Sequence, residues 1–190
     1  MKTNIFKSAL LLVLAFSFAS FTTLLTKDVN VTESSIQWKG YKVTGSHEGT
    51  IALENGTLMF EDDKLVGGDF TIDMSSIIVT DLKAGNGKEN LEGHLKSDDF
   101  FGVEEFPKAM FKMTSVSGSN GKYQVKGNMT IKGETNPVAF EMNVSGNTAK
   151  ASFKIDRTKY GIKYKSGSFF NNLKDKAIYD EFDLNVMLKF

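Results

Sequence analysis

The chain of 190 residues contains no cysteine and only two prolines, and its formal net charge at pH 7 is zero. The absence of cysteine excludes disulfide bonds, thiolate metal sites, a cysteine nucleophile and the lipid-modified cysteine of a bacterial lipoprotein. The chain also lacks the basic excess that accompanies nucleic-acid binding, so we expect no nucleic-acid partner. Its length suggests one domain, with room for an appendage.

The N-terminal segment has the pattern of a signal peptide. Two lysines and no acid precede an apolar run at residues 8–20, and Ser17-Phe18-Ala19 places small residues where a signal peptidase cleaves. The run is short for a spanning helix, which needs about 20 apolar residues. The apolar residues 21–25 extend it, which leaves an uncleaved anchor as the alternative. We predict a signal peptide at 1–19, a mature domain at 20–190, export to the periplasm or out of a bacterial cell, and no stable membrane insertion after cleavage.

Apolar and polar residues alternate along much of the remaining chain, which predicts β-strands. One apolar and one polar face are typical of antiparallel sheets, and regularly spaced strands with tight turns indicate a sandwich or barrel. The fold class predicted from these residues is therefore all-β. The predicted strands lie at about 34–44, 48–54, 57–61, 65–74, 108–117, 122–132, 137–145 and 149–156, with a ninth at 179–190.

Turn-forming residues separate several of these strands. Asn55-Gly56 and Asn120-Gly121 each supply the two positive-φ positions of a type I′ hairpin turn. Looser turns are expected at 62–64 and 146–148. The apolar phase of the first strand switches at Gly40, which predicts a β-bulge or a sharp bend.

Residues 92–111, EGHLKSDDFFGVEEFPKAMF, could be a catalytic or metal-binding cluster. Asp98 and Asp99 are adjacent, however, so their carboxylates diverge in either regular structure. His47 and His94 are the only histidines, and neither has a second histidine at a zinc-binding spacing. A zinc site built from both histidines and one aspartate is therefore the minor alternative. We predict no catalytic residue, no metal site and no cofactor.

The favoured interpretation of this stretch is structural. A short helix at about 88–97 places Leu91, His94 and Leu95 on one face, which can lie over one end of a barrel. His94 is then expected to be a hydrogen-bonded packing residue. Pro107 suits the first position of the next strand, because it cannot donate a ladder hydrogen bond.

The segment GHLKSDDFFGVEEFPKAMF also resembles the signature of the polyisoprenoid-binding YceI-like family. Four further segments are similar to that family in the same order: WKGYKVTGSHEGTI, SIIVTD, VKGNMTIKGETNPVAFEM and IDRTKYGIKY. The family often has a histidine where this chain has Lys132 and Gly133, so no role of that histidine is carried over. The resemblance implies an extended lipocalin-like antiparallel barrel. Together with the strands and helix predicted above, the expected fold is a barrel of about eight strands with one short helix capping an end. It also implies export to the periplasm, a long isoprenoid or similar amphiphilic lipid held in the lumen, and no established catalysis.

Methionine and phenylalanine on the inward faces of the predicted strands suit a flexible hydrocarbon chain. The same side chains could instead fill a dry core. The residues expected to contact a ligand are Phe111, Met113, Met129, Phe140, Met142, Phe153, Arg157, Phe182 and Leu184.

The basic segment 157–176 could hold an anionic head group if it lies at the mouth of the barrel. Arg157 is either a bidentate anion contact or a pin that pairs with Asp156 or a carboxylate at a strand end. Three hypotheses follow: an exported lipid carrier or buffer, an enzyme or accessory factor with His47 and His94 at the mouth, and a stress-protective barrel with a filled core. The sequence leaves the oligomeric state and the ligand's length and head group open.

Overall fold

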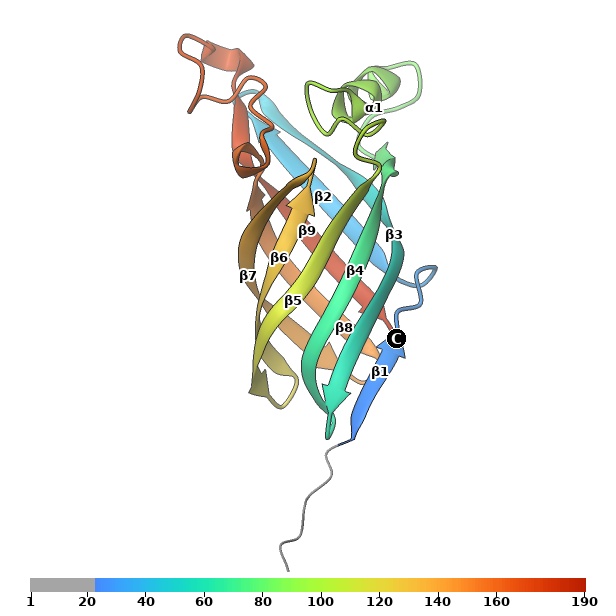
Figure 1. Ribbon diagram of the computed structural model, residues 1–190. Coiled ribbons are helices and arrows are strands. Elements are labelled where there is room, and N and C mark those ends of the chain that lie inside the picture. Colours follow the sequence, from blue (N-terminus) through green and yellow to red (C-terminus); the bar gives the residue numbers. More distant parts are fainter. Residues whose placement is uncertain (1–22) are drawn as a thin grey trace, which may run out of the picture.

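The computed structural model describes residues 23–190, which form a nine-stranded antiparallel sheet with one α-helix and two short 3-10 helices (Figure 1). Strands β2 to β9 pair in a closed ring, and β1 lies outside the ring against the second half of β3. The predicted signal peptide lies outside the described residues. The elements are β1 (Leu24–Asp28), β2 (Ser35–Lys42), β3 (Gly45–Glu61), β4 (Lys64–Val79), α1 (Lys88–Lys96), β5 (Lys108–Ser119), β6 (Lys122–Ile131), β7 (Glu134–Ser145), β8 (Thr148–Asp156), η1 (Arg157–Tyr160), η2 (Lys174–Lys176) and β9 (Ile178–Lys189).

This architecture confirms the predicted antiparallel barrel and its single short helix. Figure 1 shows that α1 and the segment that joins η1 to β9 overhang the same end of the barrel. We call this end the mouth. The hairpin turns at 62–63, 120–121 and 146–147 lie at the opposite end. The helix and the basic segment therefore face one another across one opening.

The predicted hairpin turn at Asn55-Gly56 is wrong, because β3 continues through it from Gly45 to Glu61. Neither Asn55 nor Gly56 adopts a positive φ. The pairing of β3 with β4 shifts register between Leu53 and Asn55, so a bulge takes the place of the turn. Position 56 requires a glycine for a different reason, because a Cβ there would lie 2.6 Å from the ring of Phe70.

Other local predictions have mixed outcomes. The turn at Asn120-Gly121 is confirmed by positive φ angles of 55° and 79°, and the irregularity at Gly40 is confirmed as a register shift between β2 and β9. The predicted end of a strand at residue 74 is wrong, because β4 runs on to Val79. Strand β1 was not predicted.

The end of the barrel opposite the mouth has a solid core. Alternate residues of β3, β5, β6 and β8 point inward there and are buried, and we call this region the filled end. Leu58 and Val125 are fully buried, and the rings of Phe60 and Phe190 lie 5.5 Å apart. The buried residues of the filled end include Leu58, Phe60, Leu65, Met113, Tyr123, Val125 and Ala149.

Candidate functional site

Between the filled end and the mouth, the barrel encloses a cavity of about 170 Å³, which we call the lumen. All eight strands of the ring contribute to its wall, and Leu95 of α1 and the following Phe100 and Phe101 cover it on the mouth side. The wall is almost wholly apolar. The hypothesis of a core filled from end to end is therefore wrong.

Eight of the nine residues predicted to contact a ligand line this lumen. Met113 is buried but does not line it. Met113 is paired with Gly127, two positions further from the mouth than the Phe111–Met129 pair, and it belongs to the filled end. The eight residues that the structure brings together around the lumen are Phe111, Met129, Phe140, Met142, Phe153, Arg157, Phe182 and Leu184.

A row of phenylalanine rings forms one side of the lumen. Phe70, Phe111, Phe140 and Phe153 are neighbours in that order, with ring centroids 6.3, 5.4 and 4.2 Å apart. Gly127 makes room for this row, because a Cβ there would lie 2.3 Å from the ring of Phe111. The rings present flat apolar area to the lumen, as the sequence predicted for a hydrocarbon contact.

A second cavity, of about 470 Å³, lies at the mouth. Trp38, Tyr41 and Phe100 belong to its wall and also to the wall of the lumen, so the two spaces adjoin. Its polar rim includes the histidines that the sequence singled out and three lysines against one acid. The charged and titratable residues of this rim are Lys42, His47, His94, Lys165, Asp175 and Lys176.

The two histidines at the mouth have different surroundings. Nδ1 of His47 lies 2.8 Å from Oδ2 of Asp81. Burial alone would raise the pKa of Asp81, but hydrogen bonds from His47 and the amide of Glu48 bring it below its ordinary value. Among residues 23–190, no three His, Cys, Asp or Glu side chains form a metal-binding group.

His94 packs between aromatic rings, with centroid distances of 4.4 Å to Tyr164 and 5.6 Å to Phe100. Its Nε2 is buried and has no hydrogen-bond partner within the described residues, so the prediction of a hydrogen-bonded histidine is wrong for this atom. Burial lowers the pKa of His94; Asp99 opposes this effect and Lys165 adds to it. An unpaired buried nitrogen is costly, which makes it a natural partner for a polar ligand group.

Arg157 belongs to the lumen wall, and only 2% of it is exposed. Its Nε, Nη1 and Nη2 donate to the backbone carbonyls of Tyr179, Ile162 and Ile178 at 3.1, 2.8 and 3.0 Å. Nη2 also lies 3.6 Å from Oδ1 of Asp180. The pinning role is therefore observed, with Asp180 rather than Asp156 as the carboxylate.

Sequence reasoning missed much of the lumen wall on β2, β3 and β4. Ile51 and Leu53 stand at alternate positions of β3, and Ile72 and Met74 do so on β4. Their alternation was a usable signal. Because a turn was predicted at 55–56, β3 was divided into two short strands and was not recognised as one long strand of the barrel.

The chain is similar to known proteins over most of its length. Residues 28–190 match the YceI-like domain. A UPF0312 protein of Staphylococcus aureus (strain USA300) is 36% identical over an alignment of 101 residues, and the match covers 47% of this chain and 56% of that protein. A UPF0312 protein of Staphylococcus epidermidis is 34% identical over the same share of each chain. The aligned segment therefore spans only about half the length of these curated relatives.

Solved structures share the fold at low identity. BcnA of Burkholderia cenocepacia has a TM-score of 0.64 and 19% identity, and the match covers 84% of this chain and 98% of that one. A polyisoprenoid-binding domain from Saccharophagus degradans has a TM-score of 0.57 and 13% identity, covering 87% and 97%. Within residues 23–190, no helix is both long and apolar enough to cross a bilayer. Because the family match extends over nearly the whole barrel, this chain belongs to the YceI-like domain family.

Proposed function

We propose that the protein binds a polyisoprenoid or similar long-chain amphiphile, with the tail in the lumen and the polar head at the mouth. The observation that carries this proposal is an apolar lumen that adjoins a polar, lysine-bearing cavity. The polyisoprenoid-binding relative from Saccharophagus degradans supports the ligand class. The signal-peptide pattern at 1–19 supports export, where the protein would serve as a carrier or buffer and not as an enzyme.

The lumen volume sets a scale for the buried tail. A group the size of a water molecule needs about 10–15 Å³ of cavity volume, and a methylene group is of similar size. The 170 Å³ lumen therefore holds on the order of ten to fifteen carbons, or two to three isoprene units. At about 0.8 kcal/mol per buried CH₂, this tail contributes roughly 8–12 kcal/mol, which is comparable to the roughly 4–15 kcal/mol cost of association. A longer tail would extend through the mouth.

The mouth suits a polar head group. Lys42, Lys165 and Lys176 surround the cavity with one acid, Asp175, so the local charge favours an anion such as a phosphate. His94 adds a buried nitrogen, in the wall of the mouth cavity, that has no hydrogen-bond partner within residues 23–190. Arg157 borders the lumen, but its contacts to three carbonyls give it a supporting role, and we assign the head group to the lysines and His94.

Native mass spectrometry after gentle extraction, followed by titration with polyprenols and polyprenyl phosphates, tests this function. We expect a co-purifying lipid, and loss of binding in the lumen-filling variants Ala109→Trp and Ala151→Phe. Ala139→Trp is the matched control, because Ala139 is exposed on the outer face of β7. Thermal unfolding establishes that each variant is folded. A lipid-free protein that ignores these compounds, or folded lumen-filling variants that bind like the wild type, would contradict the proposal.

A further inference from the structure

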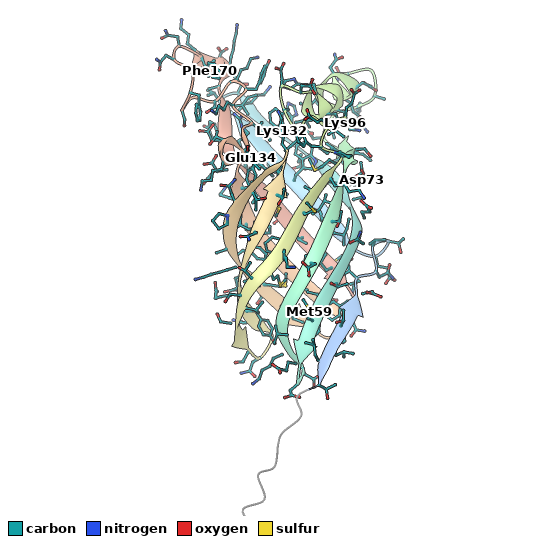
Figure 2. The ribbon with its side chains drawn as sticks, viewed as in Figure 1. Met59, Asp73, Lys96, Lys132, Glu134 and Phe170 are labelled. Carbon is teal, nitrogen blue, oxygen red and sulfur yellow. The ribbon has the colours of Figure 1, made fainter. Side chains whose placement is uncertain are left out.

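We propose that the basic segment beside the mouth, residues 163–176, docks the protein on an anionic lipid bilayer. We call this segment the mouth loop. Phe169 and Phe170 lie side by side in it, and each is 50% exposed. Figure 2 shows Phe170 at the outer edge of the mouth, away from the barrel wall. Exposed aromatic side chains at one edge of a protein are typical of a surface that enters a membrane interface.

The charge of the mouth loop complements an anionic surface. Lys163, Lys174 and Lys176 are exposed and Lys165 is half-buried, against the single acid Asp175. The Nζ of Lys163 lies 4.6 Å from the centre of the Phe169 ring, so cation and ring are presented together. Lysines beside exposed aromatic rings favour lipid head groups over a purely apolar partner.

The loop holds these rings in place before any contact with a membrane. Ser166 is fully buried, and its carbonyl accepts hydrogen bonds from the amides of Phe169 and Phe170 at 3.2 and 3.0 Å. The hydroxyl of Ser168 donates to Oδ2 of Asp180 at 2.5 Å. Asp180 in turn lies beside Arg157. Because the loop is already ordered, docking loses little conformational entropy.

The mouth loop also lies where docking would be useful. Lys165 and Lys176 belong both to the loop and to the wall of the mouth cavity. A bilayer bound here would face the opening, and a lipid tail could enter the lumen without crossing water. This use of docking rests on the proposed function, whereas docking itself can be measured without any polyprenol.

Vesicle flotation tests the proposal with the chain that begins at Ser20, since every strand that the structure describes lies within residues 24–189. We expect binding to vesicles of equimolar phosphatidylcholine and phosphatidylglycerol, weaker binding in high salt, and little binding to pure phosphatidylcholine. Replacing both rings, Phe169→Ser with Phe170→Ser, should weaken binding about 10- to 100-fold. Lys163→Gln and Lys174→Gln should each weaken it about fivefold.

Two matched controls use the rest of the surface. Leu24 and Leu25 form an exposed apolar pair on β1, away from the mouth, and Lys126 and Lys150 are exposed on the barrel wall. Changing the leucines to serine, or these lysines to glutamine, should alter binding far less than the mouth-loop variants do. Phe170→Trp in a Trp38→Phe background gives a direct readout, since brominated lipids should quench the single tryptophan that remains; Trp38 is replaced because it lines the lumen and a brominated tail there could also quench it.

The proposal is overturned if neither vesicle binds, or if the Leu24 and Leu25 variants lose as much binding as the mouth-loop variants. It is also overturned if the protein binds soluble polyglutamate as tightly as vesicles and independently of Phe169 and Phe170, which would indicate an acidic protein partner. Polyprenol binding measured in the same variants separates the two proposals. If the protein binds polyprenol but not vesicles, only the proposal of membrane docking is rejected. If it binds vesicles but not polyprenol, only the proposed lipid-carrier function is rejected.

Discussion

The filled end and the lumen are built from the same strands but differ in what their inward side chains leave between them. On β8, Ala149 points into the filled end and Ala151 points into the lumen, two residues further along the same strand. At the filled end, large inward side chains such as Leu58 and Tyr123 are buried. Around the lumen, small residues such as Gly40 and Ala109 interrupt the aromatic wall. A closed barrel therefore does not by itself determine whether its interior is solid or hollow.

The largest expected difference between the two regions comes from shortening one leucine in each. Leu58 is fully buried, so Leu58→Ala should lower the free energy of unfolding by about 3–5 kcal/mol through lost transfer energy and a new cavity. Leu184 already borders empty space, so Leu184→Ala should cost only about 1–2 kcal/mol in lipid-free protein. Urea denaturation measures both, and equal costs would contradict the distinction.

The mouth depends on polar contacts where the filled end depends on packing. Arg157→Lys keeps the charge but loses the planar guanidinium that reaches three carbonyls, and should cost about 2–3 kcal/mol. The amides near Ile162 and Ile178 should then exchange hydrogen faster, while those near Val125 should change little. Uniformly faster exchange throughout the barrel would contradict this local role.

Enlarging the two alanines of β8 should sharpen the comparison. Ala149 is 1% exposed in the filled end, and Ala149→Leu should destabilise the protein by about 1–3 kcal/mol through overpacking. Ala151→Leu should be nearly neutral in the lipid-free protein, because the added carbons enter the lumen. The same variant should weaken binding of a polyprenol. Thermal unfolding and polyprenol titration measure the two effects, and a reversed order of stability would refute the assignment of Ala149 and Ala151.

The smallest expected effect is a pH dependence at the mouth. Burial lowers the pKa of His94 below its ordinary 6.5, with Asp99 opposing and Lys165 adding to the shift. The folded state therefore binds fewer protons at this site than the unfolded state does. The contribution of neutral His94 to the free energy of unfolding is therefore fully present above pH 6.5. It decreases as the pH falls from 6.5 towards the folded-state pKa. His94→Phe should remove this part of the pH dependence, and an unchanged profile in denaturation curves would contradict it.

Local sequence signals gave correct predictions where the residues of one short segment alone determine its structure. The turn at Asn120-Gly121 follows from two residues that tolerate positive φ. The same dipeptide at 55–56 gave a wrong prediction, because Gly56 is required by the Phe70 ring of the neighbouring strand. In the same way, Met113 has the right alternation for a lumen residue but lies on the filled side of the boundary.

The sequence by itself determined the antiparallel strands, the short helix, the inward phase of seven lumen residues and the resemblance to the YceI-like family. Apolar alternation, the spacing of helix-face residues and turn propensity are properties of neighbouring residues, so they can be read along the chain. Only the tertiary structure decided where the solid core ends, that Arg157 is a pin, and that α1 and the mouth loop flank one opening. Those features depend on which side chains lie opposite one another across the barrel. Residues far apart in the sequence become opposite neighbours only when the sheet closes.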